Sequence, residues 1–400
     1  MPDEVVVSIR AQVLAASQKL DAWIEEQNFK GWDPFDALNS SLLKRLTFGN
    51  RRLGQIWVQL LKRSHINLRP LLGVRKEYNP KGMGLFLASY LRKYKIDLSN
   101  KHAERVRFFA SWLLDHISPG YHGACWGYPF DWPNRDFFAK AGTPTIVNTG
   151  FVGLSFVDLH LSDNEFGVSQ DALSISESSC NFVLNDLNRY EVGNDELCFS
   201  YTPIDKRWIH NANLLGAWLL AATSACNENA RFAQAARASA NYSVRRQRSE
   251  GWWPYGEDKK EGWVDNFHTG FVLLALRNIG YLLKTTDFEK AAQKGYLFWK
   301  NNFFLSDGTP KYYPERISPT DIHCASQAIL TFLSFRDVDS EAQELADRTA
   351  SWAIRNMQSQ QGYFYYQKRN YFQNKIPYMR WSEAWMQRAL TEIEYQKWKE

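Results

Sequence analysis

Short apolar segments recur along the chain, each beginning with a small or polar cluster and lacking a polar face. Six segments of this kind begin at Asn79, Asn148, Asn211, His268, His323 and Ser382, at steps of 69, 63, 57, 55 and 59 residues. Each is too short to span a membrane, and a helix that is apolar nearly all round belongs inside a large protein. The pattern therefore predicts six buried helices.

A second kind of helix alternates with the first. Apolar residues at i, i+3, i+4 and i+7 with charges opposite them predict amphipathic helices. These helices are expected over Ile9–Gln27, Ala103–His116, Gln170–Asn188, Ala230–Arg246, Phe288–Asn301 and Ala342–Asn356. Six such pairs are typical of an (α/α)6 toroid, an all-α fold with the bare helices in an inner ring and the amphipathic helices in an outer ring. No linker rich in Pro, Gly or Ser interrupts the repeat, so we expect a single domain over residues 1–400.

Loops rich in aromatic residues and turn formers precede most of the predicted inner helices. These loops start at Cys125, Cys198, Gly251, Lys311 and Gly362. Each loop precedes the same element of a hairpin, so in a toroid all of them lie at the same end of the ring. We therefore expect the loops to converge on one mouth.

Composition and charge exclude several classes of protein. The chain is 44% hydrophobic and 23% charged with a net charge of +5, which excludes intrinsic disorder. Its densest basic run, Arg245–Arg248, is too short for a nucleic-acid footprint. No signal-peptide pattern and no apolar run of about 18 residues occur, so we expect a cytoplasmic protein with no membrane insertion. Five cysteines without CxxC spacing argue against a disulfide framework and a simple structural zinc site.

Four motifs carry a resemblance to a known superfamily. They are Gly31-Trp-Asp-Pro-Phe-Asp-Ala-Leu-Asn-Ser, the loop from Cys125 to Trp132, Val264-Asp-Asn-Phe-His-Thr-Gly-Phe and Tyr378-Met-Arg-Trp-Ser-Glu-Ala-Trp-Met. Over essentially its whole length the chain resembles the six-hairpin (α/α)6 toroid superfamily of glycoside hydrolases, polysaccharide lyases and sugar epimerases. More narrowly, it is similar to a bacterial and archaeal group associated with surface-polysaccharide biosynthesis. The resemblance implies the fold and transfers no catalytic residue, because fold does not determine chemistry.

Two Asp/His pairs stand at the starts of consecutive inner helices. Asp265 and His268 begin one helix, and Asp321 and His323 take nearly the same place in the next repeat. Chemistry on sugars requires acid and base groups in a concave site, and these four are our first catalytic candidates. The competing interpretation makes both aspartates helix N-caps and both histidines core residues. His210 occupies the matching location one repeat earlier and is a candidate for substrate binding.

The remaining candidates lie at the last inner helix and in the aromatic loops. Glu383 begins the last helix and is the fifth catalytic candidate, although a carboxylate there also favours the helix dipole. Arg380 either pairs with Glu383 or grips a substrate carboxylate, and Asp131 is a candidate for binding sugar hydroxyls. Flat aromatic faces suit sugar rings, and the alternative is packing between loops. The aromatic candidates for substrate binding are Trp126, Trp132, Trp252, Trp253, Tyr255, Tyr312, Tyr313, Tyr365 and Tyr366.

Three functions follow from these residues. The first is glycoside-hydrolase-like, with Asp265 and either Asp321 or Glu383 as the two carboxylates. The second is a uronic-acid lyase or C5-epimerase, in which a His or Tyr removes a proton while Arg380 neutralises the developing charge. The third is a non-catalytic glycan-binding toroid whose aspartates are only caps. We rank the hydrolase first, expect a glycan or sugar substrate without a cofactor or metal, and leave the oligomeric state open.

Two other toroid chemistries fit the sequence less well. A terpene cyclase requires a DxDD or DDxxD cluster, and neither occurs in the chain. A zinc site of the lanthionine-cyclase type takes two Cys and one His, which Cys125, His323 and Cys324 match by type. Adjacent His and Cys ligands are geometrically awkward, however, and the Cys-His-Gly motif of that family is absent.

Overall fold

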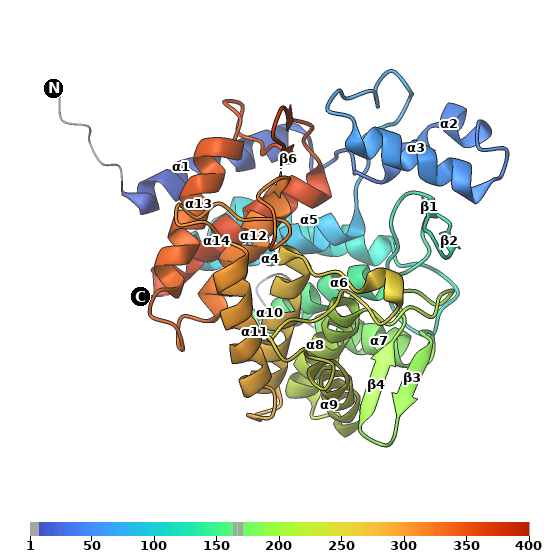
Figure 1. The fold of residues 1–400 in the computed structure, drawn as a ribbon, viewed down its shortest axis with the longest axis vertical. Coiled ribbons are helices and arrows are strands. Elements are labelled where there is room, and N and C mark those ends of the chain that lie inside the picture. The colour runs from blue at the N-terminus through green and yellow to red at the C-terminus, as the bar shows by residue number, and fades with distance from the viewer. Residues whose placement is uncertain (1–7, 163–165, 167–170, 400) are drawn as a thin grey trace.

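The computed structural model describes residues 8–162, 166 and 171–399. Six of its helices form a closed inner ring (Figure 1). They are α4 (Pro80–Asp97), α6 (Ile146–His160), α8 (His210–Asn227), α10 (Asn266–Leu282), α12 (Ile322–Ser334) and α14 (Ala384–Lys399). Each packs against the next, and α14 packs against α4, which closes the ring. The predicted inner helices are thereby confirmed.

The inner helices are buried because they have no polar face to turn outward. In α12, for example, every residue from Ile322 to Leu333 is buried. Side chains cap the first turns of several of these helices. Asn79 accepts from the backbone of α4, Thr145 from α6, and Asp265 and Asp321 from α10 and α12. Each cap fixes the residue at which its helix begins, and hence which side chains the first turn presents.

Six amphipathic helices form an outer layer around the ring. They are α1 (Ile9–Glu26), α5 (Asn100–Asp115), α7 (Ala172–Asn185), α9 (Ala230–Val244), α11 (Glu289–Asn302) and α13 (Ala342–Met357). Each packs on an inner helix, from α5 on α4 round to α1 on α14. All six match the predicted amphipathic segments, and only the expected start of α7 at Gln170 lies outside the described residues.

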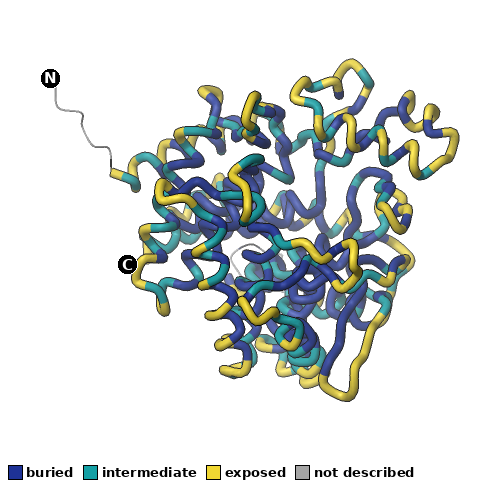
Figure 2. Tube along the Cα trace, viewed as in Figure 1, coloured by how far each residue is buried: buried dark blue, intermediate teal, exposed yellow. Residues whose placement is uncertain are grey.

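One region departs from the repeat. Residues 37–76, which we call the arm, connect α1 to α4 and contain the helices α2 (Ser41–Arg45) and α3 (Arg51–Arg63), where no helix was predicted. The arm stands at the edge of the molecule beside β1 and β2 (Figure 1) and is largely exposed (Figure 2). It packs around a small cluster of its own that includes Leu38, Leu43, Val58 and Val74. The expected all-α toroid therefore carries an additional helical element.

Short secondary elements shape the mouth-side loops. Three small antiparallel sheets pair β1 (Trp132–Pro133) with β2 (Phe138–Ala139), β3 (Arg189–Val192) with β4 (Glu196–Phe199), and β5 (Thr320–Asp321) with β6 (Gln367–Lys368) and β7 (Gln373–Asn374). Single turns form η1 (Asp36–Asn39), η2 (Lys259–Glu261) and η3 (Met379–Glu383), the last leading directly into α14. None of the described helices combines the length and apolarity that crossing a membrane requires.

Candidate functional site

A cavity lies where the first turns of the inner helices meet. Its outer part, between the aromatic loops, has a volume of about 430 Å³, and a deeper part of about 70 Å³ continues between the helix starts. The two parts share Tyr128, Tyr201, His268 and Arg380 in their walls, so they form one depression. The combined size is that of a small-molecule site. The cavity lies between the aromatic loops, at the end of the ring where the sequence predicted that these loops converge.

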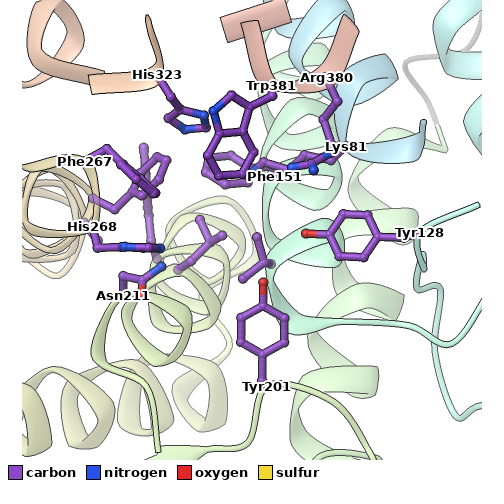
Figure 3. Close-up of a pocket in the computed structure, with 15 residues that line it drawn as sticks. Lys81, Tyr128, Phe151, Tyr201, Asn211, Phe267, His268, His323, Arg380 and Trp381 are labelled. Carbon is purple, nitrogen blue, oxygen red and sulfur yellow. The ribbon is translucent and has the colours of Figure 1, made fainter. Parts of the chain in front are cut away.

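The walls of the deep part come from residues far apart in the sequence. The first turns of α4, α8, α10 and α12 contribute Lys81, Asn211, His268 and His323, and η3 contributes Arg380. These side chains point towards a common space, together with Tyr128 and Tyr201 (Figure 3). Among the described residues that line this part, the ionisable groups are imidazoles, phenols, one amine and one guanidinium, and none is a carboxylate.

His268 is held by the carboxylate that caps its own helix. Asp265 Oδ1 accepts the backbone N–H of His268 at 2.9 Å, and Asp265 Oδ2 lies 2.8 Å from His268 Nδ1. A carboxylate partner on Nδ1 places the proton there and leaves the lone pair on Nε2. Nε2 has no hydrogen-bond partner within the described part of the chain, and the ring lines the cavity. Asp265 is therefore both the predicted cap of α10 and the partner of His268.

Asp321 caps α12 but does not hold the imidazole of His323. It accepts the backbone N–H of His323 at 2.9 Å, Gln367 Nε2 at 2.7 Å and Trp381 Nε1 at 3.0 Å. Complete burial raises the pKa of Asp321 to about 6. Asp321 is not among the residues that line the cavity. Its contacts are therefore those of a structural cap.

His323 is buried in the deep wall with no partner for either ring nitrogen among the described residues. Its ring lies among Phe267, Trp381 and Trp385, with centroids 4.7 to 4.9 Å away. Burial, with the nearby positive charge of Lys81, holds the pKa of His323 well below its ordinary value. A buried polar group without a hydrogen-bond partner calls for an explanation. A hydroxyl group of a ligand bound in the cavity would be such a partner.

Arg380 and Glu383 are separated by the fold. Arg380 binds Asp33 in a two-pronged pair, with Nε 2.5 Å from Oδ2 and Nη2 2.9 Å from Oδ1. Glu383 is fully buried outside the cavity, where its Oε2 accepts the backbone N–H of Phe364 at 2.8 Å. Burial raises the pKa of Glu383 well above its usual range. The suggested pairing of Arg380 with Glu383 is therefore wrong, because Asp33 takes that place.

Lys81 is a deeply buried amine without an acidic partner among the described residues. It is buried, and within the described residues no carboxylate lies in ion-pairing range of its Nζ. Instead Nζ lies over the rings of Phe151 at 4.6 Å and Trp385 at 5.1 Å. Burial and the charge of Arg380 lower the pKa of Lys81 well below its ordinary value. The site thus presents an amine that an anionic ligand would stabilise in its charged form.

The predicted aromatic candidates divide into two groups. Trp132, Tyr255, Tyr312 and Tyr313 line the outer cavity. The others lie outside the cavity walls, and they are Trp126, Trp252, Trp253, Tyr365 and Tyr366. Of these, Trp126 and Trp253 are buried and donate their indole N–H groups to backbone carbonyls. They position the loops rather than contact the cavity.

Two polar candidates also lie outside the cavity walls. Asp131 pairs with Lys44 at 2.6 Å and accepts the backbone N–H of Ala141. His210 is buried behind the wall, where its Nε2 lies 2.7 Å from Glu257 and its Nδ1 3.2 Å from Ser243. Apart from Ala141, their partners come from other segments of the chain, Lys44 from α2, Glu257 from the loop before η2 and Ser243 from α9.

Several lining residues were missed by the sequence analysis. They are Lys62, Lys81, Tyr128, Tyr201 and Trp381, and Asp33 is added as the partner of Arg380. One signal was available for Lys81. It is the second residue of α4, the register that His323 holds in α12. Tyr128 and Tyr201 come from loops, whose path the repeat does not specify.

The residues considered for zinc lie apart. Cys125 is buried in the core with its Sγ 3.8 Å from the carbonyl oxygen of Ser118, whereas His323 lines the deep cavity. Within the described ranges, no three His, Cys, Asp or Glu side chains are grouped as a metal ion would require.

No protein-family model matches the chain, and no curated protein matches its sequence. Solved structures, by contrast, match its fold. A possible member of the GH105 family from Salmonella enterica subsp. enterica serovar Paratyphi A has a TM-score of 0.64 at 10% identity, over 99% of this chain and 97% of that chain. The unsaturated glucuronyl hydrolase from Bacillus sp. GL1 has a TM-score of 0.63 at 12% identity, over 96% and 97%. The cellobiose 2-epimerase from Bacillus thermoamylovorans has a TM-score of 0.61 at 9% identity, over 80% and 90%.

At such identities the likeness shows the fold. The chain is an (α/α)6 toroid, as its sequence predicted. The narrower similarity to a group associated with surface-polysaccharide biosynthesis stays a prediction.

Proposed function

We propose that the chain is a carbohydrate-active enzyme that removes a proton from a carbon atom next to a carbonyl or carboxylate group of a sugar. Isomerisation, epimerisation and elimination all begin with this step. The observation that carries the proposal is the set of groups in the deep cavity, where two imidazoles, an amine and a guanidinium face one space without a carboxylate. Three solved structures of the same fold are named for enzymes of sugars, two of them hydrolases or possible hydrolases and one an epimerase.

His268 is the base in this proposal. Its Nδ1 is bound by Asp265, which orients the ring and stabilises the imidazolium that forms when Nε2 takes a proton. His323 stands one repeat away in the same cavity with a neutral ring. A neutral imidazole can donate a hydrogen bond to a sugar oxygen and accept another, so it serves to position the substrate.

Lys81 and Arg380 stabilise the negative charge that develops when the proton leaves. Both line the deep cavity, and Lys81 has no competing carboxylate in ion-pairing range among the described residues. Fixed positive groups in a site with little water act strongly on such a charge. The same groups favour a substrate that is itself anionic, such as a uronate.

Hydrolysis, which we ranked first from the sequence, is less well supported by the geometry. It requires two carboxylates that face the scissile bond. Asp265 binds His268, Asp321 binds Gln367 and Trp381, and Glu383 lies in the core. The carboxylates that do line the cavity are in its outer part, where Glu261 is paired with Arg207.

Solvent exchange tests the proposal. The purified protein is incubated in D₂O with uronate oligosaccharides and with neutral reducing disaccharides, and deuterium at carbon is measured by NMR and mass spectrometry. We expect incorporation next to the carbonyl or carboxylate carbon for isomerisation or epimerisation, or an unsaturated uronate product for elimination, and loss of either signal in His268→Gln. The matched control is His122→Gln, because His122 makes a similar 2.7 Å pair with Asp186 at an exposed site.

Two outcomes would contradict the proposal. Net addition of water across a glycosidic bond, without deuterium at carbon and without an unsaturated product, would establish hydrolysis. Binding of a saccharide without any turnover, unchanged in His268→Gln, would establish a glycan-binding protein instead.

A further inference from the structure

The arm has a charge composition unlike that of the rest of the chain. Residues 37–76 contain nine Lys and Arg residues and no Asp or Glu, whereas the chain as a whole has a net charge of +5. The remainder is therefore net acidic. The basic residues are spread out in ones and twos, so a search for basic runs does not detect them.

The fold uses only part of this charge. Arg69 is buried and binds Asp36 at 2.7 Å, and Lys44 pairs with Asp131 at 2.6 Å. Four exposed arginines of the arm have no carboxylate within ion-pairing distance among the residues that the structure describes. They are Arg45, Arg52, Arg63 and Arg75. Their charge is available to a partner outside this chain.

The arm also exposes apolar side chains, although it has a core of its own. On α3, Gly54, Val58 and Leu61 face inward, while Leu53, Ile56 and Leu60 form a neighbouring stripe that faces solvent. Over the whole arm nine large apolar side chains are exposed, and no other described segment of this length exposes as many. They are Leu42, Leu46, Phe48, Leu53, Ile56, Leu60, Ile66, Leu68 and Leu71.

Hydrogen bonds hold the arm against the toroid, so its exposed apolar side chains have defined positions. Arg69 Nη2 donates to the carbonyl oxygen of Asp33 at 3.0 Å, and Asn39 Nδ2 donates to the carbonyl oxygen of Pro129 at 3.1 Å. From the far end of the chain, Asn374 donates to the carbonyl oxygen of Ser64 at 2.9 Å. The exposed apolar surface therefore belongs to an ordered element and calls for a partner.

We propose that the arm binds the surface of a membrane that contains anionic lipids. Exposed apolar side chains interleaved with exposed arginines are the composition of elements that lie in the lipid interface, where the apolar groups enter the acyl boundary and the cations meet phosphate headgroups. Charge complementarity decides between this partner and a second copy of the chain. A symmetric dimer through the arm would set arginines against arginines without an acidic residue of the arm between them.

Such binding is peripheral. The helix α3 has 13 residues, too few to span a bilayer. The position of the arm gives the binding a consequence, because Gln59 and Lys62 of α3 line the outer cavity. A molecule held by its arm would have the cavity mouth beside the lipid surface.

Vesicle flotation with the full chain tests this proposal. We expect the protein to float with vesicles of phosphatidylcholine mixed with phosphatidylglycerol, and not with phosphatidylcholine alone. Binding should weaken as salt is raised, because the headgroup attraction is screened. The triple variant Leu53→Gln, Ile56→Gln, Leu60→Gln should lower the partition coefficient at least ten-fold. Its control, Leu161→Gln with Leu297→Gln, changes exposed apolar residues elsewhere and should bind normally.

Charge is tested separately. Replacing Arg45, Arg52 and Arg63 by Gln should lower the partition coefficient about five-fold for each arginine. The control replaces three exposed lysines outside the arm, Lys284, Lys290 and Lys294, and should leave binding unchanged. Thermal unfolding of each variant verifies that it is folded.

The proposal is overturned if the wild-type chain does not float with anionic vesicles, or if the arm variants float as well as the wild type. A concentration-dependent dimer that the Leu53, Ile56 and Leu60 triple variant abolishes, without vesicle binding, would also overturn it and assign the face to self-association.

Discussion

Two consecutive inner helices, α10 and α12, begin with the same two residue types and present different chemistry. In α10 the spacing from Asp265 to His268 is three residues, and the carboxylate reaches both the backbone and the ring of the histidine. In α12 the spacing from Asp321 to His323 is two, and the ring turns away from its cap. One residue of spacing thus separates an imidazole oriented as a base from an imidazole without a partner.

The comparison teaches that a repeated motif does not imply a repeated role. Both aspartates cap their helices, so the cap interpretation is confirmed for each. In addition to the cap, Asp265 binds the imidazole of the cavity residue His268, whereas Asp321 accepts hydrogen bonds from Gln367 and Trp381. The following changes test that difference.

The largest effect is expected from His268→Gln. Loss of a general base lowers a rate about 10²- to 10⁴-fold, so deuterium exchange into the sugar should fall by that factor. The free energy of unfolding should change little, because His268 is partly exposed to the cavity. A rate within a few-fold of wild type would remove His268 from the mechanism.

Asp265→Asn should also lower the rate, by no more than His268→Gln does, because the amide no longer holds the proton on Nδ1. The amide keeps an oxygen to cap α10 but cannot serve both the backbone and Nδ1–H as the carboxylate does. Asp186→Asn, in the exposed His122 pair, is the control.

Asp321→Asn should change stability rather than rate. The pKa of Asp321 is raised from 3.8 to about 6 in the fold, so the folded state binds the proton more tightly than the unfolded state. This contribution is complete below the unfolded value and is lost as pH rises through about 6. Urea unfolding between about pH 4 and pH 6 should show a wild-type slope about 1.4 kcal/mol per pH unit more negative than that of the variant. Parallel slopes would contradict the assignment.

His323→Gln should give the opposite trend. The pKa of His323 is held well below 6.5 in the fold, so the unfolded state takes the proton first as pH falls. The wild type should lose up to about 1.4 kcal/mol per pH unit below 6.5 relative to the variant. The same urea series measures it, and equal losses in both proteins would show that His323 is not neutral.

The smallest effect is expected from Glu383→Gln. The raised pKa makes Glu383 a neutral acid whose Oε2 accepts the N–H of Phe364, and glutamine preserves shape and acceptor. The free energy of unfolding should change by less than about 1 kcal/mol and the exchange rate should stay the same. A large loss of rate would return Glu383 to the site.

The inner and outer helices could be predicted from sequence periodicity, because the burial of each helix is reflected in the pattern of its own apolar residues. The helices α6, α8 and α12 lack a polar face, and each outer helix has an apolar stripe, so each could be recognised from its own residues. The arm carries a clear helical pattern too, but not one that shows how its helix packs. Its helix α3 exposes one apolar stripe beside the one it buries, so its pattern does not show which side meets the core.

The site was less predictable than the ring. The titratable first-turn residues His268 and His323 were identified from the register of the helices. The pairing of Arg380 with Asp33, 347 positions apart, was not, since no local pattern links a loop before the ring with its last helix. Likewise Trp126 and Trp253 have the same loop setting as Trp132, and only the path of each loop decides which one reaches the cavity.

The sequence by itself determined the number, order and nature of the inner and outer helices, and hence the toroid and the convergence of its loops. Tertiary structure alone decided which acids remain available for chemistry. A carboxylate binds whichever donors the fold brings within hydrogen-bonding distance, and those donors come from its own helix or from other repeats. Asp321 is bound by Gln367 and Trp381, and Asp265 by the histidine of its own helix.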